Sequence, residues 1–199
     1  MAKYTKIAAD TFKKLQLNAG VLCTNFEPAT AEVTDANILA ATSGGVNFTA
    51  TPSFTDFGED IDNCPKNTME LKRLDSWEVK LSGTAVSVDT KTAKSFIGLA
   101  DVSSTKVTPR NDLKTSDFAD LWWVGDYSDV NVDGPSSAKA GFIAIHMINA
   151  LSTGGFQLQT ADKEKGTFSF EYTEHYSMSA QDTVPFEVYV SPATPAPGK

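Results

Sequence analysis

Short runs in which apolar and polar residues alternate dominate the chain, and clusters of Gly, Asp, Pro and Ser separate them. The alternation is clear in GVNFTAT (residues 45–51) and in SWEVKLSG (residues 76–83), where Trp77, Val79 and Leu81 fall on one face. A period of two is typical of a strand that buries one face against a core. Each of these runs therefore predicts a β-strand.

The second half of the chain predicts further strands. AGFIAIHMINAL (residues 140–151) is apolar on both faces and rich in β-branched residues, which indicates a buried strand rather than a helix. GGFQLQT (residues 154–160) and GTFSFEYTEHYS (residues 166–177) flank a charged turn at residues 162–166, and this arrangement predicts a hairpin. PFEVYVS (residues 185–191) predicts a final strand.

One segment, DTKTAKSFIGLAD (residues 89–101), has a helical period instead. Its apolar residues follow the i, i+3, i+4, i+7 spacing of one helix face: Ala93, Phe96, Ile97 and Ala100. Asp89 or Thr90 stands where an N-cap belongs. The fold is thus predicted to be mainly β, a β-sandwich or partly closed β-barrel, with one short flanking helix at about residues 90–100.

We expect a single domain over residues 1–190, with an N-terminal arm at about residues 1–20. Residues 52–75 form a polar connection that is too long for an ordinary hairpin, and connections of this length in compact domains usually have a function. SPATPAPGK (residues 191–199) contains three prolines and predicts a flexible tail that does not join a sheet. The extended ends and the long loop therefore differ from the compact middle.

The chain of 199 residues carries a formal net charge of −8, and its 17 Lys and Arg residues are scattered. Nucleic-acid affinity depends on cations that neutralise phosphates, so this composition excludes a sequence-specific DNA or RNA reader. No apolar run fits a signal peptide or a membrane span, and we expect no membrane partner. Without a secretion signal, Cys23 and Cys64 are predicted to be free thiols.

Two motifs resemble metal sites and fail on their context. Asp56-Phe57-Gly58 matches the magnesium-binding tripeptide of protein kinases, but no Gly-rich loop, strand lysine or catalytic-loop Asp precedes it. DVNVDG (residues 129–134) matches the start of a calcium loop, but Ala140 stands where the loop needs a bidentate Glu. We interpret residues 129–134 as a turn, with a weak cation site as the alternative. No metal site and no cofactor are expected.

Candidate catalytic residues are equally few. His146 lies in an apolar run, which is typical of a core histidine, and His175 lies near a strand end, where a surface or interface role fits better than acid–base chemistry. The chain has no HExxH, CxxC, GxSxG or P-loop motif. Trp122 and Trp123 point to opposite faces of a strand, so at least one belongs to the core, and we favour an interface for the other. We expect no catalytic residues and no enzyme.

The long connection carries acids at one end and mostly basic residues at the other. The acidic half contains Asp56, Glu59, Asp60 and Asp62, and the following half contains Lys66, Glu70, Lys72 and Arg73. Such a loop suits a head-to-tail contact between subunits, which closes into rings or continues as a filament. The alternative is a solvated loop whose charges only favour hydration.

Four stretches carry a resemblance to a known family. They are GGVNFTATPSFTDFGEDIDNCPKNTMELKRLDSWEVKLSGT, RNDLKTSDFADLWWVGDYSD, GFIAIHMINALSTGGFQ and YSMSAQDTVPFEVYV. Together, from about residue 14 to residue 191, the chain resembles the major tail proteins of long-tailed, siphovirus-type bacteriophages and prophages of Gram-positive bacteria. The resemblance covers whole segments and no known functional residues.

The resemblance implies a structural virion protein, made in the host cytoplasm, that assembles as stacked hexameric rings to form a tail tube. It implies that double-stranded DNA passes through the lumen without specific binding, and that tape-measure, terminator and initiator proteins are further partners. It also implies that a long loop and the terminal arms contact the neighbouring ring. Our hypothesis is that the acidic residues of the long connection meet basic groups of that ring, and that Val21, Leu22 and the N-terminal segment form a second inter-ring contact.

An acidic or neutral polar lumen repels phosphate and so suits a DNA conduit. The candidates for lumen-facing residues, with outer solvent as the alternative, are Gln157, Gln159, Glu171, Glu174 and Glu187. A different class of function remains open beside the tail tube: a β-sandwich binding module, for example for carbohydrate, with Trp122, Trp123 and Tyr127 as a stacking platform.

Overall fold

The fold comes from a computed structural model, which describes residues 6–8, 10–127, 137–139, 141–192 and 194–195. The strands are β1 (Gln16–Cys23), β2 (Ile38–Ala40), β3 (Thr42–Asp56), β4 (Lys72–Ala85), β5 (Ala100–Ser103), β6 (Lys106–Pro109), β7 (Ala119–Tyr127), β8 (Ser137–Lys139), β9 (Phe142–Ser152), β10 (Gln157–Gln159), β11 (Thr167–Thr173), β12 (Phe186–Ser191) and β13 (Thr194–Pro195). The helical elements are α1 (Thr90–Ile97) and the 3-10 turns η1 (Thr11–Lys14), η2 (Met69–Leu71) and η3 (Thr115–Asp117). The expected mainly-β fold with one α-helix is confirmed.

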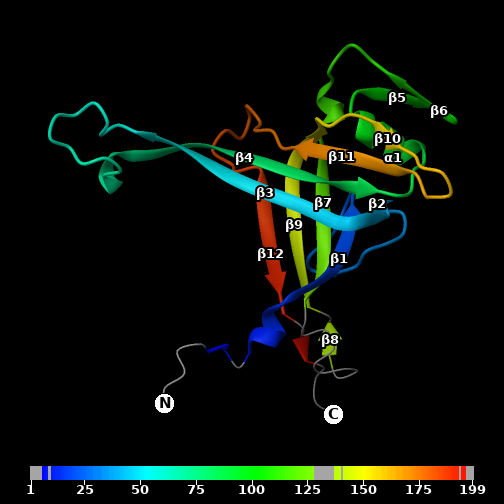
Figure 1. Cartoon of the computed structure of the whole chain (residues 1–199), viewed down its shortest axis with the longest axis horizontal. Helices are drawn as coiled ribbons and strands as arrows, with labels where there is room; N and C mark the ends of the chain where they lie inside the picture. Colours follow the sequence, from blue (N-terminus) through cyan, green and yellow to red (C-terminus); the bar gives the residue numbers. More distant parts are fainter. Residues whose placement is uncertain (1–5, 9, 128–136, 140, 193, 196–199) are drawn as a thin grey trace.

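The strands form two layers that cross each other (Figure 1). The first layer, here the upright sheet, contains β2, β1, β7, β9 and β12, and the second, here the crossing sheet, contains β10, β11, β4 and β3. The layers join where β11 pairs with β9 at Tyr172↔Ser152. Over the described residues the strand order has two ends, so the sheets form an open, sandwich-like arrangement and not a closed barrel.

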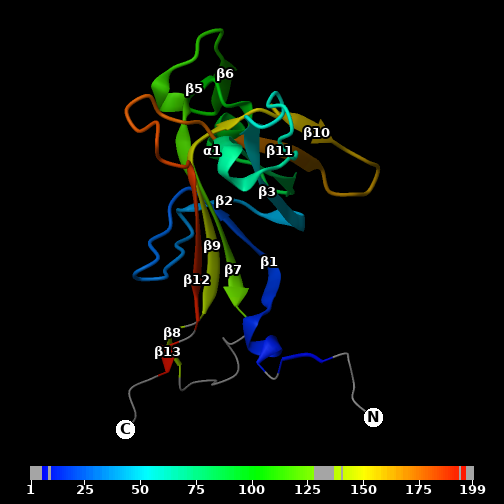
Figure 2. The same cartoon turned by 90° about the vertical axis from the view of Figure 1, so that its left-hand side faces the viewer.

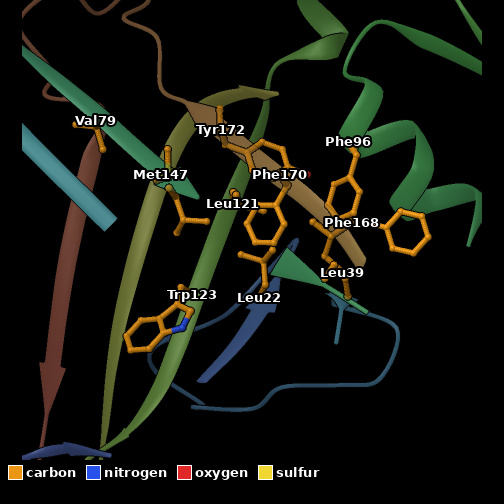
Figure 3. Close-up of a cluster of buried hydrophobic side chains, with 14 residues drawn as sticks. Leu22, Leu39, Val79, Phe96, Leu121, Trp123, Met147, Phe168, Phe170 and Tyr172 are labelled. Atoms are coloured by element: carbon orange, nitrogen blue, oxygen red, sulfur yellow. The ribbon is translucent and has the colours of Figure 1, made fainter. Parts of the chain in front are cut away.

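The main core lies between the two sheets. Alternate residues of each strand point into it, as the period of two predicts: Val79 and Leu81 from β4, Phe170 from β11, and Leu22 and Met147 from the upright sheet. Figure 3 shows Val79, Met147, Phe170 and Leu22 within this cluster, with Phe96 of α1 reaching toward it from one side. Burial of apolar side chains of this size is the main favourable contribution to the stability of such a layer pair.

Helix α1 closes one end of this core. The Asp89 carboxylate accepts a hydrogen bond from the Thr92 amide at 2.7 Å, which is the expected N-cap. Phe96 is fully buried and stacks on Phe170, with ring centroids 5.4 Å apart. The helix ends at Gly98, whose φ of 79° suits glycine, so it is slightly shorter than predicted.

A second apolar cluster lies on the opposite face of the upright sheet. Trp122 packs there with Phe26 and Phe142, whereas the adjacent Trp123 belongs to the main core. Both indoles are buried, so the interface role favoured for one of them is wrong. The reason is that the loop between β1 and β2 places Phe26 over a face that a two-layer fold otherwise leaves open.

Three expected boundaries need correction. Pairing of β3 with β4 continues to Asp56↔Lys72, so the connection expected at 52–75 is a long β-hairpin whose turn region covers residues 57–71. Residues 16–20 of the expected N-terminal arm belong to β1, which pairs with β7. The expected tail also joins sheets, because Ser191 ends β12 and Thr194 pairs with Lys139 of β8.

Candidate functional site

The outer face of the crossing sheet is uniformly polar. Because alternate residues point away from the core, the paired strands place rows of small polar side chains side by side, for example Glu171↔Ser82 and Ser82↔Asn47. We call this surface the polar face. It contains Asn47, Thr49, Thr51, Glu78, Lys80, Ser82, Thr84, Gln157, Gln159, Ser169, Glu171 and Thr173.

The charges on the polar face leave no free cation among these residues. Lys80 forms an ion pair with Glu78 at 2.5 Å, and this pairing raises the pKa of Lys80. The Glu171 carboxylate accepts a hydrogen bond from the Thr153 hydroxyl at 3.3 Å. Glu78 and Glu171 against a single Lys80 make the face weakly acidic, and an acidic surface repels a phosphate backbone.

The predicted lumen residues fall into two groups. Gln157, Gln159 and Glu171 lie together on the polar face. Glu187 lies elsewhere, on the outer face of the upright sheet, where its carboxylate bonds Tyr189 and His146.

The expectation that Glu174 lies on an exposed strand face is wrong, because only 5% of it is exposed. Its Oε1 accepts a hydrogen bond from the Val79 amide at 3.1 Å. Burial raises the pKa of the Glu174 carboxyl. Glu174 is therefore part of the strand framework and not of a surface.

The outer part of the β3–β4 hairpin projects from the body (Figure 1), and we call residues 52–75 the arm. Its pairing includes a β-bulge between Ser53 and Phe54, which adds Asp75 to the opposite strand. The extra residue keeps Trp77 and Leu74 on the same face even though they are three positions apart. The inward, apolar face of the hairpin therefore continues along the arm to the pair Phe54↔Leu74.

Apolar side chains on the arm have little to pack against in their own chain. Phe54 is 49% exposed and Leu74 is 46% exposed. Three further apolar residues of the arm are also exposed: Phe57, Ile61 and Met69. Exposed apolar residues gathered on one projecting element are typical of a surface that another molecule covers.

The charged residues of the arm divide into structural and free groups. Asp56 is structural: its carboxylate accepts hydrogen bonds from the amides of Gly58 and Asn67, both at 2.9 Å. These two bonds are the main reason that the pKa of Asp56 is lowered. The kinase-like tripeptide thus closes the hairpin end. The other charged residues of the turn region that were expected at the inter-ring contact are exposed: Glu59, Asp60, Asp62, Lys66 and Glu70.

Lys72 and Arg73 contact aromatic rings of their own arm. The Lys72 Nζ lies 5.2 Å from the centroid of the Phe54 ring, and the Arg73 guanidinium lies 5.6 Å from that of Phe57. Such cation–π contacts are worth about 0.5–1 kcal/mol at exposed sites. They place positive charge around the exposed rings without burying them.

The structure corrects the Leu22 part of the second expected inter-ring contact. Leu22 is fully buried in the main core, and Val21 packs against the second cluster. Both residues lie within β1, because that strand starts earlier than the expected arm allows. Leu22 is therefore unavailable for a contact between rings. Val21 is only partly buried, and its inter-ring contact stays a prediction.

The expected stacking platform is also absent. Trp122, Trp123 and Tyr127 are each more than nine-tenths buried, so they offer no open aromatic surface to a sugar. The Trp123 Nε1 donates to the Ala19 carbonyl at 3.0 Å, which satisfies its polar atom inside the fold. These aromatic residues are core residues.

A cavity of about 270 Å³ lies between α1 and the ends of β7 and β9. Some of its polar groups are paired within the chain: the Ser95 and Tyr172 hydroxyls lie 2.6 Å apart, and the Lys91 Nζ donates to the Ala36 carbonyl at 2.7 Å. None of the lining residues has a buried side-chain nitrogen or oxygen atom without a hydrogen-bond partner. Burial is the main cause that raises the pKa of Tyr172 well above its ordinary value. The cavity therefore has no buried polar atom that needs a ligand.

The part of the chain that the structure describes contains no cluster of metal ligands and no membrane-spanning helix. There, no group of three His, Cys, Asp or Glu side chains could hold a metal ion, and no helix is long and apolar enough to cross a membrane. The possible cation turn at residues 129–134 lies outside the described residues. Cys23 and Cys64 are free cysteines, and burial raises the pKa of the Cys23 thiol to about 11.

Comparison with known proteins gives similar structures but no sequence relatives. No protein-family profile and no curated protein sequence matches the chain. The tail of an empty gene transfer agent particle, solved with C6 symmetry, aligns with a TM-score of 0.40 and 6% identity over 80% of this chain and 92% of that one. A virion of the native particle gives 0.41 and 6%, over 87% and 95%. TM-scores near 0.4 at 6% identity mark only a loose likeness between the folds and show nothing about function.

Proposed function

We propose that this chain is a structural subunit of a phage-like tail, not an enzyme, and that copies of it assemble as stacked hexameric rings around a central channel. The observation that carries the proposal is that one small fold has two distinct surfaces. One is a broad polar face without a free cation, and the other is a projecting arm with exposed apolar residues. The first suits a channel wall, and the second suits contact between subunits.

The polar face forms the channel wall in this proposal. Its Ser, Thr, Asn and Gln side chains offer hydrogen bonds that water replaces easily, and Glu171 adds weak repulsion toward phosphate. Double-stranded DNA then passes during infection without being held. A tape-measure protein occupies the channel before DNA, and terminator and initiator proteins bind the tube ends.

The sequence resemblance to major tail proteins and the composition both support this function. A basic, DNA-clamping surface would oppose it, and the net charge of −8 has the opposite sign. In the rival binding-module hypothesis, Trp122, Trp123 and Tyr127 have to be open, and all three are buried. We place the assembled protein in the virion, after synthesis in the bacterial cytoplasm.

Electron microscopy of the concentrated protein tests assembly, and cysteine labelling tests the channel wall. In a Cys64→Ser background, a Gln157→Cys protein should react with small and with bulky maleimides before assembly. In tubes it should react with the small reagent and resist the bulky one. Equal labelling by the bulky reagent in tubes overturns the channel assignment. Failure to form rings or tubes, with or without added tail initiator, overturns the function.

A further inference from the structure

We propose that the apolar face of the arm, at Phe54 and Leu74, packs on Val188 and Val190 of β12 in a second copy of this chain. The inference rests on the proposed self-assembly and names the two surfaces that meet. It adds an apolar contact to the charge-based one expected from the sequence. Two independent features of the fold, one on each surface, lead to it.

The first feature is that the hairpin and β12 already form this kind of contact within one chain. Phe186 of β12 meets Trp77 with ring centroids 5.4 Å apart and Phe48 with centroids 5.9 Å apart. Phe48 and Trp77 lie on the inward face of the hairpin, and Phe54 and Leu74 continue that face outward. The arm therefore extends a packing surface beyond the point where its own chain can cover it.

The second feature is that the apolar face of β12 also continues beyond the layer that covers it. Phe186, Val188 and Val190 alternate along the strand and so share one face. Phe186 packs on the main core, whereas Val188 is 53% exposed and Val190 is 58% exposed. Figure 2 shows β12 and β9 continuing past the crossing sheet, so this part of the inner face has no covering layer.

The neighbours of Val188 and Val190 make this surface a suitable receiver. Val188 pairs with Ile145, and Val190 pairs with Ile143, so four β-branched side chains lie together on this face. The two isoleucines are partly buried against the main core, and the two valines are the exposed part of the group. Aromatic and β-branched side chains pack well against each other on sheet surfaces. The arm's Phe54 thus meets the type of surface that Phe48 and Trp77 meet at Phe186.

The arm of one chain cannot cover its own β12 in this way. Continuous pairing of β3 with β4 to Asp56↔Lys72 makes the arm a ribbon that projects sideways, whereas β12 runs down toward β13 (Figure 1). A second copy of the chain can supply an arm that covers this β12 face, and its own β12 face can in turn receive the arm of another copy. Since the two surfaces differ, the contact is head-to-tail and propagates into rings or a stack, not a closed dimer.

Disulfide cross-linking between two different variants tests the contact directly. One protein carries Phe54→Cys and the other Val188→Cys, each with Cys64→Ser, and they are mixed, assembled and mildly oxidised. We expect a mixed cross-linked dimer. The matched control replaces Val188→Cys with Leu158→Cys, since Leu158 is 54% exposed but lies on β10, and it should give no product above background.

Charge substitutions give a second readout. Phe54→Lys or Val188→Glu alone should raise the protein concentration needed for assembly by about tenfold or more, because each puts an unpaired charge into an apolar contact. Both changes in one chain should restore part of the assembly. Tubes that form without the Phe54–Val188 cross-link overturn this contact and leave the tube function intact. A cross-link without rings or tubes supports the contact and overturns the tube.

Discussion

The His146 imidazole lies flat against the Trp122 indole, with ring centroids 3.9 Å apart and planes 8° apart. The stack holds the imidazole between two carboxylates: its Nε2 lies 3.2 Å from Asp120, and its Nδ1 lies 3.3 Å from Glu187. These contacts join β7, β9 and β12 through side chains as well as through the ladder. They therefore help to position the strand that carries the proposed receiving surface.

Replacing Glu187 should cost stability in a pH-dependent way. Hydrogen bonds from the Tyr189 hydroxyl and then from His146 lower the pKa of Glu187 from its ordinary 4.5. A lowered folded-state pKa gives stabilisation that is present above that ordinary value and lost as the pH falls through the folded-state pKa. The melting temperature of Glu187→Gln should thus lie below that of the wild type at neutral pH, and the gap should narrow in acid. A gap that is constant with pH would contradict this role.

Replacing the Glu174 carboxylate should have the opposite effect on stability. Its folded-state pKa is raised by burial, so its charge opposes folding, and stability falls as the pH rises through the ordinary value of 4.5. Gln at this position keeps an oxygen that can accept from the Val79 amide. Glu174→Gln should therefore melt at a higher temperature than the wild type at neutral pH, with no gain in acid.

A companion variant separates the charge of Glu174 from its hydrogen bond. Glu174→Ala removes the acceptor and leaves the Val79 amide unbonded, which should destabilise the fold by about 1–3 kcal/mol. Calorimetry on both variants across the acid range measures the two effects. If Glu174→Gln is less stable than the wild type at neutral pH, the charge of the Glu174 carboxylate does not oppose folding.

Gly125 should tolerate no side chain, because the Trp123 ring occupies the space. A Cβ at Gly125 would lie 2.5 Å from Cη2 and 2.8 Å from Cζ2 of that ring, far inside contact distance. Gly125→Ala should destabilise the protein by about 1–3 kcal/mol through overpacking, as measured by urea unfolding. Gly166→Ala is the matched control, since its nearest neighbour, Leu158 Cδ1, lies at 3.4 Å. Equal stability of the two variants would refute the close packing.

The sequence pattern was informative where one face of a strand meets the core. Trp77, Val79 and Leu81 were predicted on one face of a strand, and Val79 and Leu81 are indeed core residues with Trp77 packed against them. The Asp89 cap of helix α1 was equally readable, because a cap depends on residues within one turn. Local geometry of this kind follows from spacing alone.

The arm was misread as a loop for a physical reason. Beyond the body the hairpin has no layer beneath it, so burial imposes little contrast between its two faces, and the bulge at Asp75 breaks the period of two. Burial of Glu174 was unpredictable because its partner, Val79, lies 95 positions away in the chain. The register of paired strands, which sequence spacing does not provide, decides both features.

Asp56 should control the order of the arm's end without affecting the body. Its carboxylate joins the amides of Gly58 and Asn67 across the turn, and these bonds lower its pKa from 3.8. Asp56→Ala should therefore accelerate hydrogen exchange at both amides, while the amides of β7 and β9 keep their protection. Asp60→Ala, at an exposed acid of the same turn, should leave exchange unchanged.

In the wild type the same two amides should lose protection in acid, as the pH falls through the folded-state pKa of Asp56. Unchanged exchange in Asp56→Ala would show that the turn holds its shape through other contacts.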